Sequence, residues 1–148
     1  MGQPSELRKV RIDELHVNPD LTPKEDPTLT HLMQDAFEGR VPLFYAEVPL
    51  ALCVPSDPDY RPDRHPAIEA AIRLAMENWQ KQKPVSLLVY QRGVWFVVSD
   101  DYPALFAYLR GLPEYVPCWV LGKPDSPVVK NVQGPIPIED ARRILTGG

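Results

Sequence analysis

The order of patterns between residues 64 and 122 constrains the fold more than any other feature of the chain. It begins with apolar residues at helical spacing from Pro66 to about Lys81, which predict an amphipathic helix. Two apolar runs follow within residues 85–98, and between them Gly93 can adopt the positive φ that a tight turn requires. The pattern therefore predicts a helix and then a β-hairpin. The strands are almost continuously apolar, so we expect both of their faces to be covered.

A second helix, a closing strand and a final helix complete the pattern. The letters ALFAYLR predict a helix that ends at Gly111, and YVPCWVL predicts a strand. The tail PIEDARRIL predicts a short final helix. Its expected packed side comprises Ile138, Ala141, Ile144 and Leu145. Because helices and strands alternate and 148 residues suit one domain, we expect a single domain of the α/β (α+β) class.

Before this region the chain is acidic and rich in proline. We divide the sequence into an N-terminal extension, residues 1–59, that packs on a core, residues 60–148. The extension holds eleven Asp or Glu against five Lys or Arg, whereas the core holds nine against eleven. This asymmetry indicates either a basic face on the core or ordinary solvated charge. Eighteen prolines, more than twice the usual share of about 5%, predict short elements and rigid turns.

Two elements are expected inside the extension. Asp26 as N-cap and Pro27 at the first helical position predict a short amphipathic helix that ends before Gly39. Its packed face would comprise Leu29, Leu32, Met33, Ala36 and Phe37. Residues 41–54 are rich in β-forming side chains but contain two prolines, so they fit one bent strand or two edge pieces.

The cysteines and the net charge narrow the possible classes of protein. Cys53 and Cys118 lie in apolar runs without the spacing of a metal site, so we interpret both as reduced core residues. No apolar run is long enough to span a membrane or has the form of a signal peptide, so we expect a cytoplasmic protein. The net charge of −4 provides no overall attraction for nucleic acid.

An acidic turn is the first candidate for a functional site. Asp100 and Asp101 precede the helix that contains Pro103. One of them can serve only as the N-cap, because aspartate is favoured there and the helix dipole favours acid. Alternatively the two carboxylates form a catalytic or metal-binding pair, since Mg²⁺ is bound through one or two carboxylates together with phosphate oxygens.

The segment YRPDRHP is the second candidate. It places Arg61, Arg64 and His65 directly before the helix of Pro66. These side chains can bind the phosphates of a nucleotide at a helix N-terminus. They can equally belong to a solvated loop in which Asp63 or His65 caps the helix.

Two longer segments together resemble the core of the ParB/sulfiredoxin superfamily. PAIEAAIRLAMENWQKQKPVSLLVY is similar to its first half and GVWFVVSDDYPALFAYLRGLPEYVPCWVL to its second, and the match covers about 60 residues of the chain. The resemblance implies a mixed sheet flanked by helices. Family members hold phosphate with glycine and arginine in the turn that reads SDDYP here. Asp100 stands where the glycine would be, and Tyr102 and Pro103 stand where the arginines of ParB-like members would be.

The resemblance implies a role in DNA transactions, such as partition, plasmid transfer control or phage biology. It implies a pocket in which Arg61, Arg64 and His65 bind a nucleoside triphosphate while Asp100 and Asp101 hold Mg²⁺. Any catalysis would then be weak metal-dependent hydrolysis of a nucleotide or a phosphodiester. Sulfiredoxin activity is not expected, because the turn contains no cysteine.

The alternative to this function comes from a second class of protein. The chain can be a non-catalytic interaction or inhibitor protein that has lost the nucleotide pocket and binds a protein partner through its acidic N-terminal region. General DNA binding through a basic edge at Lys81 and Lys83 is a third possibility, opposed by the acidic pI. Trp95 and Trp119 are expected in the core, and only a surface position would make either a stacking platform.

Overall fold

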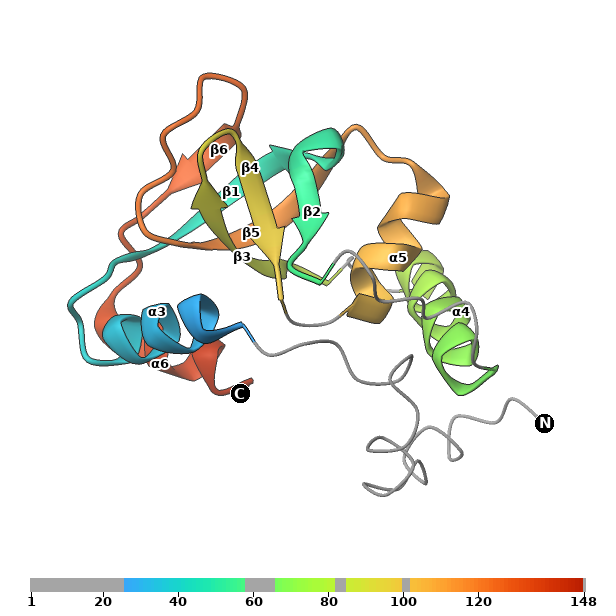
Figure 1. Cartoon of the computed structure of the whole chain (residues 1–148), viewed down its shortest axis with the longest axis horizontal. Helices are drawn as coiled ribbons and strands as arrows, with labels where there is room; N and C mark the ends of the chain where they lie inside the picture. Colours follow the sequence, from blue (N-terminus) through green and yellow to red (C-terminus); the bar gives the residue numbers. More distant parts are fainter. Residues whose placement is uncertain (1–25, 58–65, 82–84, 100–101, 148) are drawn as a thin grey trace.

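A six-stranded mixed sheet with helices on both faces forms the centre of the molecule (Figure 1). The computed structural model describes residues 26–57, 66–81, 85–99 and 102–147. The elements are α3 (Pro27–Phe37), β1 (Leu43–Pro49), the 3-10 helix η1 (Leu50–Leu52), β2 (Cys53–Pro55), α4 (Pro66–Lys81), β3 (Leu87–Arg92), β4 (Trp95–Val98), α5 (Tyr102–Gly111), β5 (Tyr115–Leu121), β6 (Lys130–Gln133) and α6 (Ile138–Leu145). The strand order is β2-β4-β3-β5-β1-β6, which confirms the predicted α/β class.

Local sequence signals account for most of these elements. The carboxylate of Asp26 accepts a hydrogen bond from the Thr28 amide at 3.2 Å, so it caps α3 as predicted. The helix α4 has the predicted bounds, and its Glu69 pairs with Arg73 at 3.2 Å. Gly93 adopts a φ of 63° in the turn of the β3–β4 hairpin, which confirms its predicted role.

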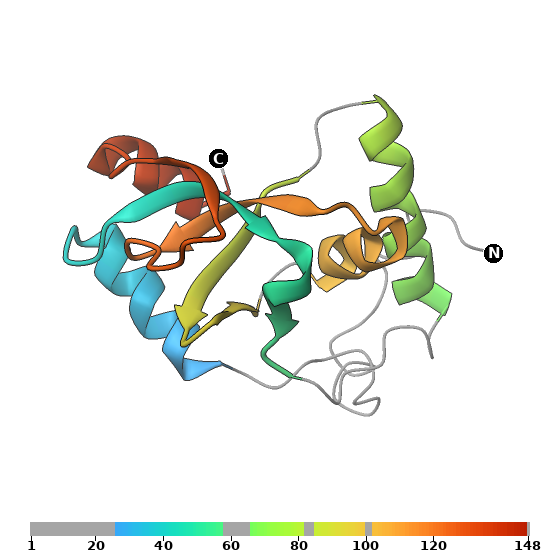
Figure 2. The same cartoon turned by 90° about the horizontal axis from the view of Figure 1, so that it is seen from above.

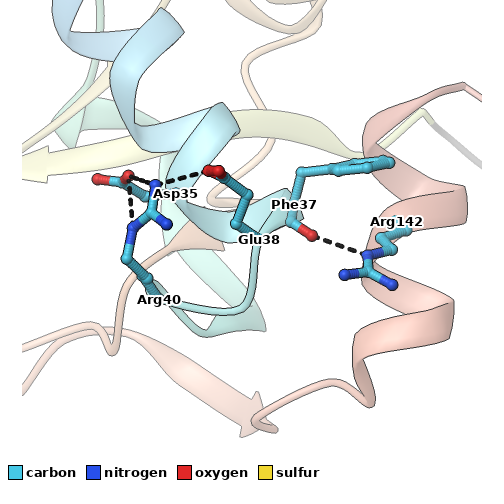
Figure 3. A network of polar contacts seen from close by, with 5 residues as sticks. All are labelled: Asp35, Phe37, Glu38, Arg40 and Arg142. Atoms are coloured by element: carbon cyan, nitrogen blue, oxygen red, sulfur yellow. Dashed lines mark hydrogen bonds and ion pairs between the residues drawn. The ribbon is translucent and has the colours of Figure 1, made fainter.

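The C-terminal end of α3 and the start of the next segment are held by two arginines (Figure 3). Arg40 donates to Asp35 at 2.8 Å and to Glu38 at 2.6 Å. Arg142 of α6 donates from Nε to the carbonyl of Phe37 at 2.8 Å, and its guanidinium lies over the Phe37 ring. The second contact satisfies a carbonyl at a helix end and ties α6 to α3.

Two predictions about packed helix faces were too broad. Phe37 and Ile138, each placed on a packed side, are 41% and 40% exposed because they lie at helix ends. In α4 helical spacing alone predicts one buried stripe that includes Ala71, Ile72 and Ala75, but Ile72 is buried whereas Ala71 and Ala75 are only half-buried. The reason is that α4 packs chiefly on α5 and not on the sheet, as Figure 2 shows.

The strands of residues 41–54 differ from both arrangements that the sequence allowed. There are two strands joined by η1, but only β2 is an edge strand, because β1 lies between β5 and β6. The prolines explain this outcome. Pro42 precedes β1 and Pro49 is its last residue, so neither removes an amide from the middle of the hydrogen-bonded ladder.

The short connection from β1 to β2 forces the sheet to curl. These strands lie four positions apart in the strand order, which in a flat sheet is about 19 Å. Four Cα steps separate Pro49 from Cys53, and they can span at most about 14 Å even when fully extended. The sheet therefore bends until its two sides approach, and Figure 2 shows β1 passing over it into η1 and β2.

The curled sheet has a concave inner face and a convex outer face. The helix α5 fills the inner face through Tyr102, Leu105 and Tyr108, so the inward side chains of the strands are sealed from solvent. The sealed strand residues include Ala46, Val48, Leu87, Val89, Phe96, Val98, Val116, Cys118 and Val120. On the outer face, α3 and α6 cover a second cluster that contains Leu43, Tyr90, Val97 and Leu121. Both faces of β3 and β4 are therefore covered, which confirms the prediction made from their almost continuous apolar residues.

The strand β6 was not predicted from the sequence. All four of its residues are exposed, so it carries no apolar pattern that periodicity could detect. Among the strands of the described residues it pairs only with β1, and the register shifts between Tyr45 and Glu47. Among the helices that the structure describes, none is long and apolar enough to cross a membrane.

Candidate binding site on the open face of the sheet

The five residues selected from the sequence, Arg61, Arg64, His65, Asp100 and Asp101, all lie outside the described residues. The residues that flank them are described. The Asp57 amide donates to the hydroxyl of Tyr102 at 3.1 Å, and the hydroxyls of Ser56 and Tyr102 share a hydrogen bond of 2.8 Å. The residue before segment 58–65 and the residue after segment 100–101 are therefore fixed side by side.

The residue after segment 58–65 is fixed elsewhere. Glu69, in the first turn of α4, forms a two-pronged ion pair with Arg110, with both N–O distances 2.6 Å. Because Arg110 lies in the last turn of α5 and Tyr102 begins that helix, Pro66 and Asp57 are attached near opposite ends of α5. Ten residues of helix correspond to about 15 Å.

A polar cluster holds the chain just before Asp100. The Asp26 carboxylate accepts hydrogen bonds from the Tyr90 hydroxyl at 2.5 Å and from the Ser99 hydroxyl. Burial acts to raise the pKa of Asp26, but these hydrogen bonds outweigh burial and leave the pKa below its ordinary value. Burial and the neighbouring carboxylate raise the pKa of Tyr90 to about 12. The sequence indicated Asp26 only as a helix cap, and the structure gives it this second role.

The outer face of the sheet is covered over only part of its area. Beyond α3 and α6, side chains of β1, β5 and β6 line an open depression, which we call the aromatic hollow. Its volume is about 510 Å³, and it is lined by Tyr45, Glu47, Ser86, Pro117, Trp119, Asn131, Gln133 and Ile136. A smaller depression of about 220 Å³ adjoins it and shares Ser86 and Trp119.

The register between β1 and β5 creates this hollow. Tyr45 lies opposite Trp119, and Glu47 lies opposite Pro117, so four outward side chains meet on neighbouring strands. The rings of Tyr45 and Trp119 form an edge-to-face pair with centroids 5.5 Å apart. Burial, and then the negative charge of Glu47, raise the pKa of the Tyr45 hydroxyl. Trp119 is thus half-buried at a surface hollow and not enclosed in the core.

Glu47 is the one acidic side chain among the described residues that line the hollow. One carboxylate oxygen accepts from the Asn131 amide at 2.7 Å, and the other has no partner within the described part of the chain. The residue is half-buried, so the carboxylate is partly shielded from water. Beside it, the Lys130 ammonium lies 4.3 Å from the centre of the Tyr115 ring. The chemistry of this face, rings next to a carboxylate, suits a cation.

The sequence contained only part of this information. Trp119 was identified as a stacking platform in case it reached the surface, but Tyr45, Glu47 and Asn131 were missed. Trp95, also expected in the core, is 45% exposed because it opens the short strand β4 beside the hairpin turn. The alternation of Tyr45 and Glu47 with apolar residues could have indicated an outward face, yet the pairing of β1 with β5 is not encoded in either strand alone. Within the described residues, no three His, Cys, Asp or Glu side chains are grouped so that they could hold a metal ion.

Comparisons with known proteins add no family to these observations. No family model matches the chain, and searches of curated proteins and of solved structures found no similar protein.

Proposed function

We propose that this protein is a non-catalytic interaction protein that binds a basic, extended segment of a partner protein on the open face of its sheet. The supporting observation is the half-buried carboxylate of Glu47, placed among Tyr45 and Trp119 with one oxygen unpaired within the described residues. An arginine or lysine side chain would complete that hydrogen bonding and stack on the rings.

The edge of the sheet supports an extended partner. The strand β6 ends the strand order, and its outer edge pairs with no strand in the described part of the chain. An unpaired edge can add a strand from another chain, which supplies main-chain hydrogen bonds. Val132 of β6 is 45% exposed and Val128, just before it, is 46% exposed, so apolar contact area is available beside the hollow. Tyrosine and tryptophan are also enriched at protein interfaces.

A display library of random peptides tests this proposal even though the partner is unidentified. We expect the selected peptides to share an arginine or lysine within a run of β-forming residues. The substitution Glu47→Gln keeps the shape of the side chain but removes its charge, and it should weaken binding of those peptides by about tenfold or more. The matched control Glu139→Gln changes an exposed carboxylate on α6 and should leave binding unchanged. Peptides without a basic residue, or equal binding by Glu47→Gln, would refute the proposal.

A second candidate function follows from the contact between Asp57 and Tyr102. This contact joins the ends of the two segments that carry Arg61, Arg64, His65, Asp100 and Asp101. It favours the ParB/sulfiredoxin-like proposal of an accessory protein in cytoplasmic DNA transactions that binds a nucleotide with Mg²⁺ and has weak phosphohydrolase or nuclease activity. The attachment of Pro66 near the far end of α5 opposes it, because His65 directly precedes that residue.

Thermal unfolding distinguishes the two candidates. A nucleotide that binds only the folded state must raise the melting temperature, so millimolar ATP, CTP or ADP with Mg²⁺ should shift it if the second candidate is right. The shift should disappear in Arg64→Ala and in Asp100→Ala. If the melting temperature does not shift, nucleotide binding is excluded and the interaction function remains.

A further inference from the structure

The aromatic hollow contains a corner formed by two ring faces. The centroids of the Tyr45 and Trp119 rings are 5.5 Å apart, and the ring planes are inclined at 73° to each other. Two nearly perpendicular faces can contact a rounded head group on two sides, whereas a flat guanidinium stacks on only one of them. Trp119 packs against the cluster that α3 and α6 cover, so this wall is in place before a ligand arrives. The shape of the corner therefore suits an ammonium group.

Glu47 supplies a negative charge to the same hollow. It stands two positions after Tyr45 on the same face of β1, and it lies opposite Pro117 of β5. One of its carboxylate oxygens accepts from the Asn131 amide at 2.7 Å, and the other has no partner within the described residues. The hollow thus offers a ligand one open carboxylate oxygen beside two ring faces.

A bulge in β6 holds one oxygen of this carboxylate. Between the paired positions β6 advances three residues, from Lys130 to Gln133, whereas β1 covers only two, between Glu47 and Tyr45. Asn131 lies in this bulge with a φ of 52°, in the left-handed region that asparagine tolerates. A bulge can re-aim a side chain, and that of Asn131 reaches Glu47. Because one oxygen is already occupied, the two-pronged pairing that arginine forms with a carboxylate is disfavoured.

A lysine of the chain itself shows the same chemistry on the neighbouring part of this face. Its register places Lys130 opposite Glu47, but the Lys130 ammonium lies 4.3 Å from the centre of the Tyr115 ring. No ion pair joins Lys130 to Glu47 in the part of the chain that the structure describes. An aromatic ring of β5 therefore holds an alkylammonium at this surface, while the carboxylate is left for a ligand.

We propose that the head group bound in the aromatic hollow is the dimethylammonium of a dimethylated lysine in the partner segment, an inference that rests on the proposed function. This group has one N–H and two methyl groups. The N–H donates to the open oxygen of Glu47, and the methyl groups lie against the rings of Tyr45 and Trp119. An unmodified lysine has three N–H groups and loses more bound water on entering the corner. A trimethylated lysine has no N–H for Glu47.

Small analogues of the side chains test the head group without any partner protein. The ends of dimethyl-lysine, lysine, trimethyl-lysine and arginine are carried by N,N-dimethylbutylammonium, butylammonium, N,N,N-trimethylbutylammonium and propylguanidinium. Each is titrated into the full chain while NMR follows the indole N–H of Trp119. We expect the dimethyl compound to bind about tenfold tighter than butylammonium and several-fold tighter than the other two. Equal affinities would overturn the proposal, as would tightest binding by the guanidinium or by the trimethylammonium, which is also the head group of choline lipids.

Two variants assign the parts of the corner. Tyr45→Leu removes one ring face, so it should reduce the preference for dimethylbutylammonium over butylammonium to about twofold or less. Trp95→Leu removes an exposed ring outside the hollow and is the matched control, which should keep the full preference. Asn131→Gly allows the positive φ of the bulge but releases the second oxygen of Glu47, so it should raise the affinity for propylguanidinium several-fold. A preference that survives Tyr45→Leu, or an unchanged guanidinium affinity in Asn131→Gly, would refute the assignment.

The peptides from the display library separate this inference from the proposed function. In each selected peptide the basic residue is replaced by dimethyl-lysine, and we expect the affinity to rise at least about fivefold. A peptide that gains nothing would overturn the choice of head group while the interaction function stands. If the library yields no peptide but dimethylbutylammonium binds with the expected preference, the head group is supported and the peptide-binding function fails.

Discussion

The two faces of the curled sheet are built from the same strands but serve opposite purposes. On β1, Ala46 and Val48 are fully buried on the inner face, whereas their neighbours Tyr45 and Glu47 point to the open part of the outer face. Residues on the inner face are selected by packing density, because α5 leaves no room for a change of volume. Outward residues are free to carry chemistry. The alternation of a single strand therefore separates the residues that stabilise the fold from those proposed to bind a partner.

The largest expected effect comes from adjacent residues of β4 that belong to different faces. Phe96 is fully buried on the inner face, whereas Trp95 beside it is 45% exposed. We expect Phe96→Ala to lower the free energy of unfolding by about 3–5 kcal/mol, because it removes a large side chain and leaves a cavity. Trp95→Ala should cost less than about 1 kcal/mol although the side chain is larger. Urea unfolding of both variants measures the difference. Equal losses would show that the inner face is not the stabilising one.

The sequence predicted the features that depend on residues close together in the chain, and it did not predict those that depend on distant residues. The bounds of α4, the cap at Asp26 and the turn at Gly93 were predicted, because each depends on residues close together in the chain. The curl was not predicted. The curl follows from the short connection between β1 and β2. The positions of these two strands in the sheet depend on pairing between residues far apart in the chain, which the sequence pattern does not encode.

The candidate site was predictable only in outline. Tyr45 and Trp119 are 74 positions apart and meet through the register of β1 with β5. Asn131 reaches Glu47 from β6, a strand without any apolar pattern. The residues that the sequence did select, such as Arg64, lie outside the described residues, so their role stays a prediction. The sequence pattern thus identified Trp119 as a possible surface aromatic, but it could not predict which residues lie beside it.

The next effect concerns the attachment of α3 to the outer face. Asp26→Ala removes the helix cap and leaves the hydroxyls of Tyr90 and Ser99 without their acceptor. We expect a loss of about 2 kcal/mol in the free energy of unfolding, since a cap alone contributes about 1 kcal/mol and Tyr90 is buried. Asp35→Ala, which removes an exposed partner of Arg40, is the control and should change stability little. If Asp26→Ala lowers the free energy of unfolding no more than the control does, the packing of α3 on the outer face does not depend on this cluster.

A smaller, pH-dependent effect on stability is expected where α4 packs against α5, away from the sheet. Hydrogen bonds and charge from Arg110, helped by Arg73, lower the pKa of Glu69 from 4.5 to about 2. A lowered pKa means that the contribution of Glu69 to stability is complete above pH 4.5 and is lost as the pH falls toward 2. Because the pair is at the surface, Glu69→Gln should cost less than about 1 kcal/mol at pH 7. The difference between the unfolding curves of the variant and of the original chain should shrink as the pH falls from 4.5 and vanish only below about 2, where Glu69 is protonated in the folded state as well. A difference that does not shrink over this range would contradict the assignment.

The smallest effect on stability is expected at the residue with the largest proposed effect on binding. Glu47 is half-buried on the open face, and its charge has no cationic partner in the described part of the chain. Glutamine retains an oxygen that can accept from Asn131, so Glu47→Gln should change the free energy of unfolding by no more than about 0.5 kcal/mol. Urea unfolding measures this value, and the selected peptides measure affinity on the same preparation. A carboxylate that only stabilised the fold would show the reverse, a clear loss of stability with unchanged affinity. A half-buried charge that adds nothing to the stability of the fold is expected where a ligand uses it.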